Sequence, residues 1–171
     1  MDQRLIWGHI NINVSDLDAS IHFYQQLGFE LFMPSIPYLN LTAEPGQSRQ
    51  LSPELAEGLG VPAGTTGRAC IMQLGKGLPK LDLTELSATD SRGPLHNSDL
   101  GFVRLCLASQ DLRSDYQRLS DQGVEFLSPP TQCANRLADM AICKDPDGTL
   151  IELLQVYLER WPRVPQTQAA T

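Results

Sequence analysis

The sequence contains no long apolar run, no excess of basic residues and few cysteines. A membrane-spanning helix needs about 20 consecutive apolar residues, so a membrane-embedded role is not expected. The formal net charge is -7 at pH 7, from 13 Lys and Arg against 20 Asp and Glu. Nucleic acids and anionic lipid surfaces attract basic proteins. The composition therefore argues against a nucleic acid or a membrane as partner.

The cysteines have neither the Cys-x-x-Cys spacing of a metal site nor the density of a disulfide-stapled domain. Two of them lie inside apolar strand patterns, where a free thiol packs as a small hydrophobe. The N-terminal Met-Asp-Gln-Arg leads into a strand pattern rather than a signal peptide. These features predict a reduced, cytoplasmic protein. The four cysteines are Cys70, Cys106, Cys133 and Cys143.

The N-terminal part of the chain shows a strand pattern followed directly by a helix pattern. Polar and apolar residues alternate over residues 9–14, which predicts a strand with His9, Asn11 and Asn13 on one face. Asp16 or its neighbour Ser15 can then cap an amphipathic helix that ends at Gly28. The other parts of the chain can be placed relative to His9.

The same pattern restarts 95 residues later. This shift superimposes His9 on Arg104, Asp16 on Asp111 and Gly28 on Gly123. Near the ends of the two halves, the residues 83–86 align with 150–153, which places Glu85 on Glu152. The sequence therefore predicts an internal duplication of a β-α-β-β-β unit.

A Pro-, Gly-, Ser- and Thr-rich stretch, residues 34–67, interrupts the first repeat. Loops of this length are uncommon in compact domains, and two interpretations remain open: a lid or binding loop, or a tolerated surface insertion. The expected organisation is a first module over 1–90 with the insertion 34–67, a polar linker over 91–99, a second module over 100–157 and a tail over 158–171.

The start Gly8-His9-Ile10-Asn11-Ile12 and the end Asp145-Pro-Asp-Gly148 followed by Ile151-Glu-Leu-Leu-Gln155 resemble the vicinal oxygen chelate superfamily. That superfamily includes glyoxalase I, methylmalonyl-CoA epimerase, extradiol dioxygenases, fosfomycin-modifying enzymes and bleomycin-resistance proteins. The resemblance covers residues 5–156. It implies an α+β fold of two tandem βαβββ modules forming an open curved-sheet cup, and a homodimer.

In that superfamily each module supplies one metal ligand from its first strand and one from its last strand. The matching positions here hold His9, Glu85, Arg104 and Glu152. The imidazole and the two carboxylates suit Fe, Mn, Ni or Zn. Arg104 cannot be a ligand, because its guanidinium stays protonated and offers only donors. Residues on the same face are expected to bind substrate: Asn11, Asn13 and Cys106.

Two functions follow from this set. The first is a glyoxalase-, isomerase-, lyase- or dioxygenase-like metalloenzyme acting on a small oxygen-bearing substrate. In it, His9, Glu85 and Glu152 bind the metal, Glu85 or Glu152 serves as general base or metal ligand, and Arg104 holds a carboxylate, enolate or phenolate of the substrate. The second is a metal-free protein that sequesters a small molecule, as bleomycin-resistance proteins do, with the metal site closed by Arg104. The retained His and Glu residues favour the enzyme, and Arg104 favours the binding protein.

Overall fold

The computed structural model describes residues 7–88 and 93–161. The chain divides into two compact units: Met1–Pro94 with Asp145–Thr149, and Leu95–Lys144 with Leu150–Thr171. The N-terminal residues that bear on the signal-peptide expectation, the start of the expected linker and most of the expected tail lie outside the described residues. No helix in the described part of the chain is long and apolar enough to cross a membrane.

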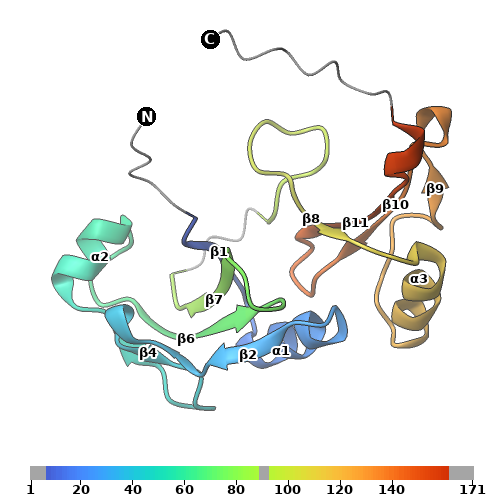
Figure 1. The fold of residues 1–171 in the computed structure, drawn as a ribbon. Helices are drawn as coiled ribbons and strands as arrows, with labels where there is room; N and C mark the ends of the chain where they lie inside the picture. The colour runs from blue at the N-terminus through green and yellow to red at the C-terminus, as the bar shows by residue number, and fades with distance from the viewer. Residues whose placement is uncertain (1–6, 89–92, 162–171) are drawn as a thin grey trace, which may run out of the picture. The chain divides into compact units, whose positions relative to one another are not determined.

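The first unit is built from a β-α-β-β-β sequence of elements around one sheet (Figure 1). The strand order is β1-β7-β6-β2, in which β1 and β7 are parallel and the other pairs are antiparallel. The elements are β1 (His9–Asn13), α1 (Leu17–Gln26), β2 (Glu30–Met33), β6 (Thr66–Gln73) and β7 (Lys80–Leu86).

The second unit repeats this topology. Its sheet has the order β8-β11-β10-β9. Here β8 and β11, the first and last strands along the chain, are parallel, and the other pairs are antiparallel. The elements are β8 (Arg104–Ala108), α3 (Leu112–Asp121), β9 (Thr131–Gln132), β10 (Ala138–Lys144) and β11 (Leu150–Val156), with short 3-10 turns at η2 (Ala134–Arg136) and η3 (Leu158–Arg160). The predicted α+β fold with two βαβββ modules is confirmed.

The repeat extends to individual hydrogen bonds. Asp16 caps α1 by accepting from the Ala19 N–H at 2.9 Å, and Asp111 caps α3 by accepting from the Ser114 N–H at 3.1 Å. The two acceptors are 95 residues apart in the sequence, and so are the two donors. Each helix is followed by a glycine in the left-handed region, which residues with a Cβ rarely adopt. These glycines are Gly28 (φ 95°) and Gly123 (φ 86°).

Alternation along β7 separates its side chains onto two faces of the first sheet. Leu81 and Leu83 are buried on the face covered by α1, whose Leu17 and Tyr24 are also buried. The opposite face carries Asp82 and Thr84, which follow the other parity. This face is open in a simple βαβββ module, but here the insertion covers part of it.

The insertion forms its own small elements, shown in blue to cyan beside β6 (Figure 1). Ile36, Leu39 and Leu51 from the insertion are buried together with Ala69 of β6. Ala69 pairs with Thr84, so this cluster lies on the face away from α1. The insertion is therefore part of the first unit's core. Its elements are β3 (Ser35–Ile36), η1 (Pro37–Leu39), β4 (Leu41–Thr42), β5 (Arg49–Gln50) and α2 (Pro53–Leu59).

Truncation of a buried insertion residue should destabilise the whole first unit. Ile36 is 0% exposed, so Ile36→Ala is expected to lower the free energy of unfolding by about 2–5 kcal/mol. Leu59 belongs to the same insertion but is 49% exposed, so Leu59→Ala should change it by less than about 0.5 kcal/mol. Urea unfolding of both variants measures this. Equal small effects would contradict the packing of the insertion into the core.

Candidate functional site

In the second unit, Arg104 and Glu152 form an ion pair on the face away from α3. The parallel register places Glu152 opposite Cys106, so Arg104, Cys106 and Glu152 share one face. The Arg104 Nε donates to Glu152 Oε2 at 2.7 Å, and Nη1 donates to Asn97 Oδ1 at 3.0 Å. The Glu152 side chain is 12% exposed and that of Arg104 is 37% exposed. The guanidinium therefore supplies the charge that balances this largely buried carboxylate.

In the first unit, the corresponding face brings His9 to Asp82. The parallel register of β1 and β7 pairs Asp82 with Asn11. Asn11 is two residues from His9 and therefore lies on the same face of the sheet. His9 Nδ1 lies 3.7 Å from Asp82 Oδ2, and the Tyr38 hydroxyl donates to the same oxygen at 2.9 Å. Tyr38 comes from η1 of the insertion, so the insertion contributes a side chain to this face.

Glu85 lies on the other face of the same strand. It is three residues from Asp82, and alternation along a strand turns such side chains to opposite sides. Its Oε2 accepts from the Leu17 N–H at 2.7 Å, at the first turn of α1. The structure therefore does not bring Glu85 together with His9, in contrast to the repeat alignment.

The second unit shows what Glu85 corresponds to. There, Gln155 Oε1 accepts from the Leu112 N–H at 2.9 Å, at the first turn of α3. Leu17 and Leu112 are 95 residues apart, so the two bonds are equivalent. Glu85 thus matches Gln155, and Asp82 matches Glu152. The alignment of the last strands by sequence is displaced by three residues, because each of the two glutamates lies next to a leucine in an apolar run.

Glu85 also belongs to a charge network around one buried residue, Arg68. Arg68 is 7% exposed and donates to both carboxylate oxygens of Asp18 in α1, at 2.9 and 3.0 Å. The same guanidinium donates to Ala43 O at 2.8 Å and lies 3.5 Å from Glu85. The hydrogen bonds to Asp18 raise the Arg68 pKa above its ordinary value. The network joins α1, the insertion and the sheet, and it gives Glu85 a structural partner.

The three residues expected to bind substrate lie on the faces predicted for them. Asn11 Nδ2 donates to Asn13 Oδ1 and to Thr84 Oγ1, both at 3.1 Å. The Cys106 side chain lies beside the Arg104–Glu152 pair, and burial of its sulfur, followed by the Glu152 charge, raises the thiol pKa. Cys106 is therefore not an activated thiolate. Its role in binding, like that of the two asparagines, stays a prediction.

The donor set does not fit a resident divalent metal as the structure arranges it. Over residues 7–88 and 93–161, no group of three or more His, Cys, Asp and Glu side chains gathers around a point that could hold an ion. Arg104, at a position where the family resemblance predicts a ligand, bonds Glu152, while Glu85 faces α1. A guanidinium that only donates and a carboxylate turned to the helix both fail as ligands for such an ion. Asp82, which the sequence analysis missed, was signalled by its Leu-Asp-Leu context, which matches Ile-Glu-Leu around Glu152.

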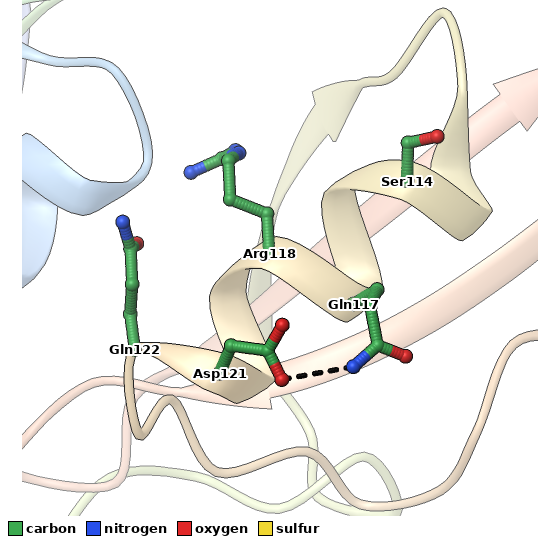
Figure 2. A pocket seen from close by; sticks show the side chains of 5 residues that line it. All are labelled: Ser114, Gln117, Arg118, Asp121 and Gln122. Atoms are coloured by element: carbon green, nitrogen blue, oxygen red, sulfur yellow. Dashed lines mark hydrogen bonds between the residues drawn. The ribbon is translucent and has the colours of Figure 1, made fainter.

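A surface hollow lies along α3, separate in its residues from the two pairs described above (Figure 2). Across it, Gln117 Nε2 donates to Asp121 Oδ1 at 2.8 Å. The side chains that line it come from α3 and from Gln122, the residue that follows the helix, and none of them is a predicted site residue. They are Ser114, Gln117, Arg118, Asp121 and Gln122.

Tyr38 should ionise at a higher pH than an ordinary tyrosine. Burial of its hydroxyl, together with the hydrogen bond and charge of Asp82, raises the Tyr38 pKa from 10.0 to about 12. The folded state therefore favours the neutral phenol, and this stabilisation is full below pH 10 and lost as pH rises through about 12. In a tyrosinate absorbance titration, Tyr38→Phe should remove a late step, and Asp82→Asn should shift that step to lower pH. Identical curves for wild type and Asp82→Asn would contradict the contact.

Comparison with known proteins places this geometry in a family. The family model described as the Glyoxalase/Bleomycin resistance protein/Dioxygenase superfamily matches residues 6–153. A glyoxalase family protein from Bacillus cereus shares the fold with a TM-score of 0.68 at 19% identity, covering 91% of this chain and 97% of that one. No curated protein sequence matches the chain.

Two further solved structures show the same fold. A superfamily member from Sphaerobacter thermophilus has a TM-score of 0.58 at 21% identity and covers 90% of this chain and 99% of that one. The trypanothione-dependent glyoxalase I of Leishmania major has a TM-score of 0.54 at 20% identity, with 90% and 87% covered. At these identities the likeness concerns the fold, whereas the family model spans most of the sequence. The chain belongs to the Glyoxalase/Bleomycin resistance protein/Dioxygenase superfamily.

Proposed function

We propose that this chain is a small-molecule-binding member of its superfamily in which Arg104 takes the place of a metal. The observation that supports this most directly is the 2.7 Å bond from Arg104 Nε to Glu152 Oε2. A guanidinium at a ligand position repels a divalent cation and already neutralises the carboxylate that the cation would need. The function that fits these residues is capture of a small molecule without metal chemistry.

Arg104 retains capacity to bind an anionic ligand group. Its bonds to Glu152 and Asn97 use two of the five N–H donors of a guanidinium, and the side chain is 37% exposed. A carboxylate, enolate or phenolate oxygen can accept from the remaining donors. The ligand would then contact protein-held positive charge at the position where a related metalloenzyme presents its ion.

The metalloenzyme remains the second candidate, and the residues near His9 are its support. His9 and Asp82 bring an imidazole within 3.7 Å of a carboxylate in the first unit. In this version Asp82, rather than Glu85, is the carboxylate ligand beside His9. The expected homodimer and cytoplasmic location remain predictions under both candidates.

Calorimetric titration of Mn²⁺, Ni²⁺ and Zn²⁺ separates the two candidates. The wild type should bind all three weakly. Arg104→His should bind at least about tenfold more tightly, because a neutral imidazole replaces a fixed positive charge and adds a ligand. Arg104→Gln is the matched control, since it removes the charge without supplying a good ligand, and its gain should be smaller.

Two outcomes would count against the proposal. Tight binding of any of the three ions by the wild type would show that Arg104 does not close the site. Equal gains in Arg104→Gln and Arg104→His would show that charge relief alone matters and that the position is not a ligand position. Circular dichroism of each variant confirms that the fold is retained.

A further inference from the structure

Asp82 is a buried carboxylate in which one oxygen accepts no hydrogen bond from the described residues. The residue is 1% exposed, and its Oδ2 accepts from the Tyr38 hydroxyl at 2.9 Å. Its Oδ1 is buried and has no hydrogen-bond partner among the described residues. Burying a charged group without its full set of hydrogen bonds is costly, and most buried polar atoms in proteins are paired. A donor from outside the chain would relieve this cost.

The strand neighbours of Asp82 cannot supply that donor. In register, Asp82 lies between Asn11 of β1 and Ile71 of β6. Ile71 has no polar side-chain atom. Asn11 Nδ2 is already bonded to Asn13 and Thr84. The carboxylate is therefore flanked by one apolar side chain and one amide whose donors are in use.

The basic residue on the same face also points elsewhere. Lys80 is two residues from Asp82 in β7 and lies on the same face, but its Nζ donates to Gln73 Oε1 at 2.7 Å. The same ammonium lies 4.6 Å from the ring centroid of Phe32. His9, with Nδ1 at 3.7 Å, is the other basic group near Asp82. This distance exceeds that of a hydrogen bond.

Two partly exposed rings lie next to the carboxylate. The His9 and Tyr38 rings are 6.3 Å apart between centroids and 25° from parallel. The side chain of His9 is 45% exposed, and Tyr38 is 57% exposed as a whole residue. Rotamer changes of such exposed side chains are fast, and the site proposed below requires such a change to open a path to Asp82. A ligand that reaches Asp82 would contact one or both rings.

We propose that Asp82, His9 and Tyr38 form a binding site for an organic cation, an amidinium, guanidinium or amine group attached to a planar ring. The cationic N–H groups donate to Asp82 Oδ1, and the planar ring contacts the His9 and Tyr38 rings. Charge-assisted bonds to a carboxylate and cation–π contact act together in such a site. The net charge of -7 favours approach of a cation. This inference goes beyond the proposed function, because it adds a cation site in the first unit to the anion-binding role of Arg104 in the second unit.

An organic cation fits these residues better than a metal ion does. His9 and Asp82 offer two metal ligands, whereas catalytic and structural metal sites use three or more protein ligands. The third neighbour, Tyr38, presents a hydroxyl that already donates to Asp82 Oδ2. A flat cation needs only an acceptor and an aromatic surface, and both are present.

Benzamidine is the probe, with benzamide as its neutral isostere and benzoate as its anionic counterpart. Isothermal titration of the full chain should show saturable binding of benzamidine and at least about tenfold weaker binding of benzamide and benzoate. Asp82→Asn should weaken benzamidine binding by about tenfold or more. Tyr38→Phe should tighten it, because both oxygens of Asp82 then become available to the two nitrogens of the amidinium.

The second unit provides a matched control. Asp139 is 9% exposed, accepts from the Tyr157 hydroxyl at 3.1 Å and also has an Oδ1 without a partner among the described residues. It lacks the pair of rings, so Asp139→Asn should leave benzamidine binding unchanged. Because Asp82→Asn tests a buried residue, benzamidine-induced changes in the NMR signals of the wild-type His9 and Tyr38 rings give a readout that needs no variant.

The outcomes distinguish this inference from the proposed function. Equal binding of benzamidine and benzamide, an unaffected folded Asp82→Asn, or unchanged ring signals would overturn the cation site. Benzoate binding lost in Arg104→Ala, without benzamidine binding, would overturn it and leave the proposed function standing. Tight metal binding by the wild type, with benzamidine binding that still depends on Asp82, would overturn the proposed function alone.

Discussion

Each unit depends on the parallel pairing of its first and last strands. Through β1–β7 and β8–β11, residues more than 40 positions apart become neighbours with fixed side-chain parity. That parity decides which side chains face the helix and which face away from it, because side chains alternate along a strand. A shift by one residue would exchange the two sets, so the register is the constraint on which the candidate site rests.

The two faces have different roles. On the helix side, Glu85 and Gln155 accept from the first turn of α1 and α3, where helical N–H groups lack partners within the helix. On the other side, Asp82 and Glu152 are carboxylates at equivalent positions of the two units, and their hydrogen-bond partners differ. One is bonded by Tyr38 from the insertion, and the other by Arg104. Both carboxylates are thus engaged in side-chain contacts.

Much of this could be predicted from sequence, because it rests on local patterns. Capping by Asp16 and Asp111 and the shared face of His9 and Asn11 follow from residue type and spacing. The residue of the first unit that is equivalent to Glu152 could not be identified from the local sequence pattern. The offset between repeats is 95 residues at the first strand, from 9 to 104, but 70 at the last, from 82 to 152. The insertion changes the count, and its Tyr38 reaches Asp82 through tertiary packing that no local pattern encodes.

We propose that the Arg104 guanidinium balances the charge of Glu152 in place of a metal ion. A double-mutant cycle with Arg104→Ala, Glu152→Ala and the double variant, measured by urea unfolding without added metal, tests it most directly. Removing one partner leaves the other charge uncompensated, so a coupling of about 1 kcal/mol or more is predicted, after allowance for the solvent exposure of Arg104. A coupling near zero would contradict the claim that this ion pair replaces a metal.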